Sequence, residues 1–180
     1  MRYLYVGGTP ELDRQALQEI RACVAGEFGA RVREMELPGV EFAFDAERGQ
    51  YGSIPVLDWL NRLCPQDALK LLAVTERDLF IPVLTFVFGQ AQLGGRAGVV
   101  SLARLRQEFY GLPRNDAVLV RRAHKEAMHE TGHLFGLVHC ADRRCVMSLA
   151  TSVRQIDAKE AVFCAPCKAR LRAQTQEFVT

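Results

Sequence analysis

The chain reads HETGHLFGLVH from residue 129 to residue 139, and this stretch decides how the rest of the sequence is interpreted. His129 and His133 are one helical turn apart, so their imidazoles lie on one face of a helix and can bind the same metal ion. Gly136 is expected to end the helix, because glycine adopts positive φ at little cost, and the chain then returns His139 as a third ligand. Three imidazoles leave the fourth position of a tetrahedral zinc ion open, which is the arrangement of a catalytic zinc.

Two carboxylates are close to these histidines on the same helix. Glu130 lies about 100° around the helix from His129, where it can reach a water molecule at the metal without becoming a ligand. We therefore predict that Glu130 is a general base. Glu126 is either a partner that orients a histidine or a solvated charge of the helix. The alternative for the whole stretch is a helix whose histidines face solvent, but three of the four histidines in the chain belong to the pattern.

A second group of metal-binding residues follows directly. Cys140 and Cys145 form C-x₄-C, and after a loop Cys164 and Cys167 form C-x₂-C. Four thiolates leave no open position on a zinc ion, so this pattern predicts a closed, structural zinc site. The alternatives are two disulfides, which need an oxidising compartment, and a redox C-x-x-C, which needs a βαβ context. We favour zinc, which gives two zinc ions per chain, one catalytic and one structural.

Together the two motifs resemble the archaemetzincin family of the metzincin clan of zinc metallopeptidases. That family reads H-E-x-x-H-x-x-G-x-x-H-C-x₄-C-x-M followed by C-x-x-C, and the motif core at residues 129–167 matches every fixed position, Met147 included. Looser similarity at residues 48–51 (RGQY) and 88–96 (FGQAQLGGR) extends the resemblance over most of the chain. The resemblance implies a minimal metzincin in which Met147 belongs to a methionine turn beneath the metal.

The leading functional prediction is a zinc metallopeptidase that hydrolyses peptide bonds in a peptide or protein substrate, with Glu130 as general base. Two alternatives stay open. One is a zinc hydrolase of another amide or ester, since the same water chemistry acts on both. The other is a catalytically silent zinc-binding or regulatory protein, against which the intact Glu130 argues.

Composition limits the class of protein. A chain of 180 residues with 49% hydrophobic and 24% charged residues is expected to form a single globular domain over residues 1–180. A net charge of +2 gives no electrostatic basis for binding nucleic acid. The apolar run in residues 1–8 is too short for a secretory signal, and the longest run, residues 79–88, contains Pro82 and is too short for a membrane span. We expect a cytoplasmic monomer that does not bind membranes.

Hydrophobic spacing predicts an α/β (α+β) fold, with a mixed twisted sheet and helices packed on it. Strands are expected at residues 2–6, 31–37, 68–74, 83–89 and 97–102, and an irregular connection at 42–51. Helices are expected at residues 10–28, at 53–63 with Ser53 as N-cap, from an N-cap at Asp116 through the histidine motif, and at 164–176.

The resemblance also implies where a substrate would bind, because metzincins place it antiparallel to an exposed edge strand above the metal. Residues 97–102 follow a flexible glycine-containing segment and are our candidate for this strand. We therefore expect Val99, Val100 and Ser101 to bind substrate. The alternative is that this segment is an internal strand of an ordinary hairpin.

Overall fold

The main sheet of the protein is mixed and has five strands in the order β2-β1-β5-β8-β7. The computed structural model describes residues 2–175. Within them β1 pairs in parallel with β2 and β5, β5 pairs in parallel with β8, and β7 runs antiparallel to β8 at the edge. The strands are β1 (Tyr3–Gly8), β2 (Val32–Glu36), β5 (Ala68–Thr75), β7 (Gly89–Ala91) and β8 (Ala97–Ser101).

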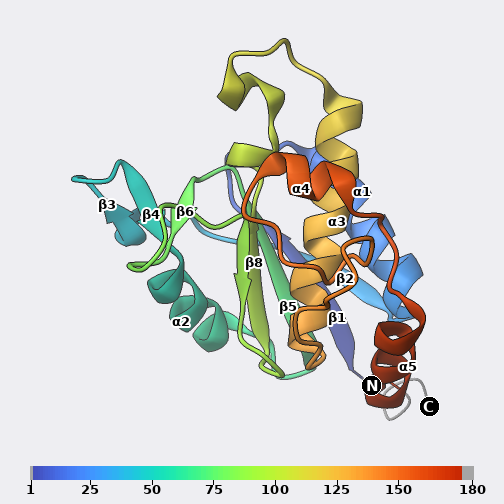
Figure 1. The fold of residues 1–180 in the computed structure, drawn as a ribbon. Coiled ribbons are helices and arrows are strands. Elements are labelled where there is room, and N and C mark those ends of the chain that lie inside the picture. Colours follow the sequence, from blue (N-terminus) through green and yellow to red (C-terminus); the bar gives the residue numbers. More distant parts are fainter. Residues whose placement is uncertain (1, 176–180) are drawn as a thin grey trace.

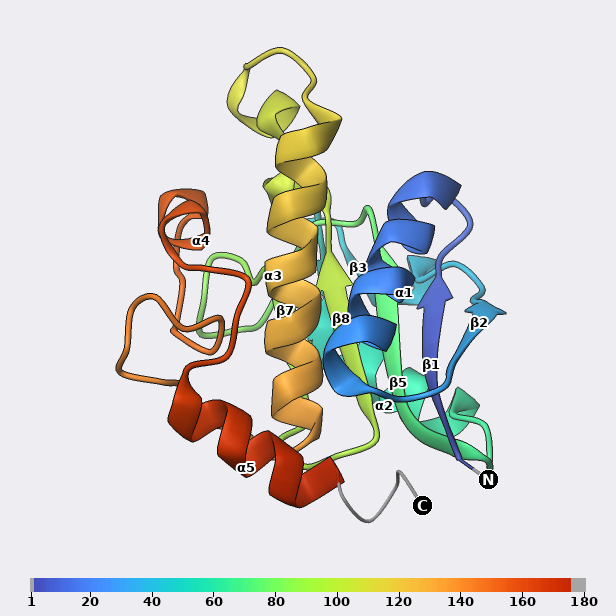
Figure 2. The same ribbon diagram turned by 90° about the vertical axis from the view of Figure 1, so that its right-hand side faces the viewer.

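Helices cover both faces of this sheet. Helices α1 (Arg14–Phe28) and α3 (Asp116–Leu134) pack on one face, and α2 (Ser53–Leu63) packs on the other (Figure 1, Figure 2). The sheet separates two hydrophobic cores, one on each face, and alternate side chains of β5 pack into one or the other. Leu72 packs into the core beneath α1 and α3, whereas Leu71 packs into the core beneath α2. The predicted α/β architecture is confirmed, and β5 is buried on both faces.

A second, smaller sheet lies on the α2 side of the main sheet (Figure 1). Its order is β3-β4-β6, with β3 and β4 joined as an antiparallel hairpin. The prediction of an irregular connection at residues 42–51 was therefore wrong, because each of its strands is too short to show a hydrophobic period. The remaining elements are β3 (Phe44–Asp45), β4 (Gln50–Gly52), β6 (Leu79–Phe80), the 3₁₀ helices η1 (Glu41–Ala43), η2 (Ala103–Leu105) and η3 (Gln107–Tyr110), and helices α4 (Val153–Ala158) and α5 (Ala165–Thr175).

The helix starts differ from the sequence-based predictions by one to several residues. Helix α1 begins at Arg14 rather than near residue 10, because the Asp13 side chain accepts a hydrogen bond of 3.0 Å from Ala16 N and caps the helix. Asn115, not Asp116, caps α3. The Ser53 hydroxyl does not cap α2; it donates instead to Phe80 O at 3.0 Å. The predicted end of the last helix, residue 176, lies outside the described residues.

Two predictions about strands were wrong. Residues 83–88 form turns rather than a strand, and the strand that follows them, β7, begins only at Gly89. The candidate edge strand is an internal strand, since β8 pairs with β5 on one side and with β7 on the other. The side chains of Val99, Val100 and Ser101 are consequently buried and cannot align a substrate. Among the helices described, none combines the length and the apolar content needed to cross a bilayer.

Candidate active site and metal centres

Helix α3 carries the first two histidines of the motif. His129 and His133 project from the same face near its C-terminal end, with their ring centroids 4.6 Å apart. Their Nε2 atoms approach to 3.0 Å, so both rings point the same nitrogen towards one place. The predicted one-turn spacing therefore brings the two imidazoles together as expected.

The chain leaves α3 through a Schellman turn. Gly136 adopts a φ of 82°, and its N–H donates to His133 O at 2.9 Å. Leu137 N donates to Gly132 O at 3.0 Å, which completes the paired hydrogen bonds of this motif. The turn brings His139 back, with its ring centroid 5.3 Å from that of His129 and 4.9 Å from that of His133. The glycine thus has the role that its place in the sequence predicts.

The hydrogen bonds of the two helical histidines leave their Nε2 atoms free for a metal. His129 Nδ1 lies 2.9 Å from Val146 O, and His133 Nδ1 lies 2.7 Å from Leu137 O. A carbonyl oxygen only accepts, so each Nδ1 carries the proton and each Nε2 presents its lone pair. Burial lowers the pKa of all three histidines, which favours the neutral form that binds metals. Nitrogen atoms of the three rings lie within 4.8 Å of one another, and this donor set fits a zinc ion.

Glu130 is buried against the edge strand. Its carboxylate and stem pack on the backbone of Gly89 in β7, where a Cβ atom would lie 2.7 Å from Glu130 Cγ. Burial raises the pKa of Glu130 well above its usual value; nearby Glu126 raises it further, and Lys159 opposes the shift. Glu130 is therefore held in one place, in surroundings that favour uptake of a proton.

Met147 lies beneath the histidines and is fully buried. Its Sδ would be 2.5 Å from a Cβ atom on Gly132, so the helix needs a glycine at this position for the methionine to fit. Met147 O accepts a hydrogen bond of 3.0 Å from Cys140 N, which joins the methionine turn to the segment that carries His139. Met147 thus contacts both the helix that carries His129 and His133 and the segment that carries His139.

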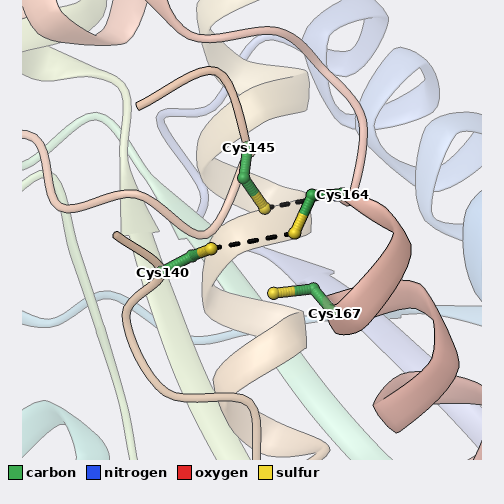
Figure 3. A group of neighbouring side chains, drawn as sticks. All are labelled: Cys140, Cys145, Cys164 and Cys167. Atoms are coloured by element: carbon green, nitrogen blue, oxygen red, sulfur yellow. Dashed lines mark hydrogen bonds between the residues drawn. The ribbon is translucent and has the colours of Figure 1, made fainter. Parts of the chain in front are cut away.

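The four predicted cysteine ligands form one cluster, next to the histidine site in sequence. Figure 3 shows the side chains of Cys140, Cys145, Cys164 and Cys167 turned towards a common centre, and their Sγ atoms all lie within 4.8 Å of one another. The Sγ atoms of Cys140 and Cys164 are 3.7 Å apart, which is close to the separation of about 3.8 Å between thiolates on a tetrahedral zinc ion. All six cysteines of the chain are free thiols. This geometry fits a metal, and no two of these thiols are joined as a disulfide.

A cleft of about 580 Å³ opens over the histidines and Glu130. Apolar side chains dominate its lining, among them Leu84, Leu93, Val138 and Leu149, which are each at least half exposed. One side of the cleft consists of β7 and the segment before it, and the other side contains Leu149 and the residues after the methionine turn. The site is therefore accessible to a ligand from solvent.

Sequence reasoning missed Lys159, a fully buried cation at the end of α4. Its ammonium lies 2.9 Å from Glu126 Oε1, and it approaches off the direction of a hydrogen bond, so the attraction is mainly Coulombic. It also donates to Ser148 O at 3.5 Å. Glu126 is thus an ion-pair partner, neither solvated nor bonded to a histidine. A lysine at this point in the sequence carries no signal that distinguishes it from a surface residue.

Comparison with known proteins agrees with this geometry. The profile of Peptidase family M54 matches residues 36–173. An archaemetzincin of Methanocaldococcus jannaschii is 46% identical over 131 residues, which cover 73% of this chain and 71% of that protein. An archaemetzincin of Pyrococcus abyssi is 38% identical over 160 residues, which cover 85% of this chain and 84% of the relative.

Solved structures give the same result. The crystal structure of an archaemetzincin from Methanopyrus kandleri superposes with a TM-score of 0.85 at 33% identity, covering 97% of this chain and 96% of that one. A zinc-dependent peptidase from Methanocorpusculum labreanum superposes with a TM-score of 0.85 at 28% identity, covering 93% of this chain and 99% of that one. The chain therefore belongs to Peptidase family M54, the archaemetzincins, and is a zinc metallopeptidase.

Proposed function

We propose that this metallopeptidase hydrolyses peptide bonds at the site formed by His129, His133 and His139, with Glu130 as the general base. The observation that supports this most directly is the position of Glu130. Its carboxylate is buried beside three converging imidazoles, in a cleft that opens to solvent. A purely structural metal site has no need of a carboxylate there.

The roles follow from the chemistry of each group. Zinc supplies Lewis acidity towards a carbonyl oxygen and towards a water molecule. Glu130 takes the proton of the attacking water, and then gives it to the leaving amine. Its raised pKa suits both steps, because the carboxylate must hold the proton between them. His129 and His133 are kept in the ligating tautomer by their bonds to Val146 O and Leu137 O.

We further propose a second zinc ion in the cysteine cluster, which makes two per chain. Four thiolates complete a tetrahedral shell, so this ion has a structural role. The cluster joins two separate parts of the chain, because Cys140 and Cys145 flank the turn before Met147, whereas Cys164 directly precedes α5 and Cys167 lies in it. Binding of zinc there contributes directly to folding stability.

The substrate is proposed to bind along β7, in place of the buried β8. Phe88 O accepts from Ser101 N at 2.8 Å and Gln92 N donates to Ala97 O at 3.3 Å, so these residues direct their backbone groups to β8. In an antiparallel pair the alternate residues point the other way, and the N–H and C=O groups of Gly89 and Ala91 are left for a further strand. Among the described residues no strand pairs with that side of β7. An extended peptide can add there beside Glu130.

The test is digestion of a diverse peptide library by zinc-loaded protein, with the Glu130→Gln variant as control and the products identified by mass spectrometry. The proposal requires cleavage by the wild type and none by the variant. Metal analysis of the same samples should give two zinc ions per chain in both proteins. If neither protein cleaves while both hold two zinc ions, a non-peptide amide or ester, or a silent binding role, replaces peptide hydrolysis as the better account.

We also propose that the protein acts as a monomer in the cytoplasm. Six free thiols, four of them in a metal cluster, suit a reducing compartment. Light scattering after size exclusion tests the monomer, for which the expected mass is 20.2 kDa. Cell fractionation tests the compartment.

A further inference from the structure

One side of the active-site cleft is a segment with little secondary structure of its own. Residues 81–88, called here the cleft wall, line the cleft with Leu84, Phe86 and Phe88. Few backbone hydrogen bonds shape the segment; they include a turn from Leu84 N to Ile81 O at 3.0 Å and a bond from Val87 N to Leu79 O at 2.9 Å. Something else must hold the wall in place, because a segment with so few backbone bonds is easily displaced.

Two side chains from the β3–β4 hairpin bind the backbone of the wall. Arg48 Nη1 donates to Ile81 O at 3.4 Å, and Arg48 Nη2 donates to Leu84 O at 3.2 Å. Gln50 Nε2 donates to Thr85 O at 3.1 Å and to Asp78 Oδ2 at 2.9 Å. Three carbonyl groups of the wall thus find their donors in one hairpin, none of whose residues lines the cleft.

The hairpin presents Arg48 in a fixed orientation. Asp45 Oδ1 accepts hydrogen bonds of 3.0 Å from both Glu47 N and Arg48 N, and Gly49 closes the turn with a φ of 65°. The Arg48 guanidinium lies 4.2 Å from the centroid of the Phe80 ring, a cation–π contact that adds to these restraints. The arginine fork is therefore preorganised for the two carbonyl oxygens.

We propose that Arg48 and Gln50 are positioning residues for substrate binding. They hold the cleft wall against the substrate without touching the substrate, the metal or Glu130. The inference rests on the proposed peptidase site, whose cleft the wall lines. Two residues of the RGQY segment at 48–51 thus gain a role, although the segment takes no part in metal binding. Loss of these contacts releases the wall. Ligands that contact the wall then bind more weakly, whereas ligands that reach only the metal bind as before.

The test compares two zinc-binding probes of different size. Acetohydroxamic acid reaches only the metal, whereas a dipeptide hydroxamate with a leucine side chain also contacts the apolar wall. Calorimetry gives the Kd of each for the wild type, for Arg48→Met and for Arg48→Met combined with Gln50→Ala. Methionine keeps an unbranched stem over Phe80 but removes the donors. Glu47→Ala, an exposed change in the same turn that removes no contact with the wall, is the matched control.

We expect the double variant to bind the dipeptide hydroxamate about tenfold more weakly, and Arg48→Met alone roughly threefold, because the ligand must order a released wall when it binds and only part of the value of the lost hydrogen bonds is felt in its Kd. Acetohydroxamic acid should bind all variants within a factor of about two, and with peptide substrates KM should rise while kcat stays nearly constant. Unchanged Kd values, or equal losses for both probes, would overturn the inference.

Hydrogen exchange separates this inference from the proposed function. Amides in residues 81–88 should exchange faster in the Arg48→Met protein than in the wild type or the Glu47→Ala control, whatever the state of the metal. A wild-type protein that binds neither probe contradicts the zinc site, and the exchange rates still decide whether Arg48 holds the wall. Equal exchange in all three proteins would overturn its role.

Discussion

The Glu130 side chain packs against Gly89 of the edge strand β7, in space that a side chain at residue 89 would fill. A Cβ atom at residue 89 would lie 2.7 Å from Glu130 Cγ and 2.8 Å from Glu130 Oε1. The strand that is proposed to receive the substrate and the carboxylate that is proposed to activate water are thus in direct contact. A change in one is transmitted to the other without an intermediate residue.

Gly89→Ala is predicted to displace the Glu130 carboxylate and to lower kcat by roughly 10²-fold, the cost of misplacing a catalytic group by about 1 Å. Zinc content should not change, because the three atoms nearest to the added Cβ are Glu130 Cγ, Glu130 Oε1 and, at 2.8 Å, Val99 O, and none of them belongs to a histidine. The control is Gly26→Ala on α1, where nothing lies within 4 Å of the added atom. Full activity in the Gly89→Ala enzyme would show that Glu130 tolerates movement.

Glu130→Gln is predicted to keep both zinc ions and to lower kcat by about 10²–10⁴-fold, since the amide cannot accept the proton. Steady-state kinetics and metal analysis of the same preparation check the two halves of this statement. Retained hydrolysis in the zinc-loaded variant would assign the base to another group.

His133→Ala and Cys164→Ser are predicted to remove different zinc ions with different consequences. The histidine variant should lose hydrolysis and one zinc ion while it stays folded, because the open site contributes chemistry. The cysteine variant should unfold at a clearly lower temperature, because binding of its metal is coupled to folding. Metal analysis combined with thermal unfolding distinguishes these results, and an equally stable Cys164→Ser protein contradicts the structural role.

Lys159→Met is predicted to destabilise the fold by about 3–5 kcal/mol, because it leaves the buried Glu126 carboxylate without its partner. Combining it with Glu126→Leu should recover most of that loss, since the second change removes the unpaired charge. Denaturant unfolding of the two single variants and the double variant measures the coupling. Arg14→Met, which breaks the exposed pair with Glu36, is the control and should change little.

The two clusters of candidate metal ligands were predictable because local spacing determines most of their geometry. One helical turn separates His129 from His133, Gly136 supplies the positive φ that returns His139, and all of this lies within eleven consecutive residues. The cysteine pairs are likewise close in sequence to the turn that they hold. Such motifs depend little on the rest of the fold.

The errors that bear on the site concern contacts between distant parts of the chain. The order of strands in the sheet places β8 between β5 and β7, and no property of residues 97–101 reveals this. Residues 83–88 are as apolar as a strand, yet their carbonyl groups bind side chains of a hairpin more than thirty residues earlier. Lys159 is buried only because α4 packs near α3, where Glu126 neutralises it. The spacing of hydrophobic residues along the chain gives no information about which distant segments contact one another.

His139 and Cys140 are consecutive residues, so the last imidazole of one metal centre and the first thiolate of the other share a peptide bond. The two histidines on α3 are fixed by the helix, whereas the third lies in a segment held on one side by the turn at Gly136 and on the other by the hydrogen bond from Cys140 N to Met147 O. Oxidants that convert the thiols to disulfides would expel the structural ion and free that anchor. With the proposed second zinc ion in the cluster, hydrolytic activity is expected to depend on the redox state of the surroundings, through a residue that takes no part in the chemistry.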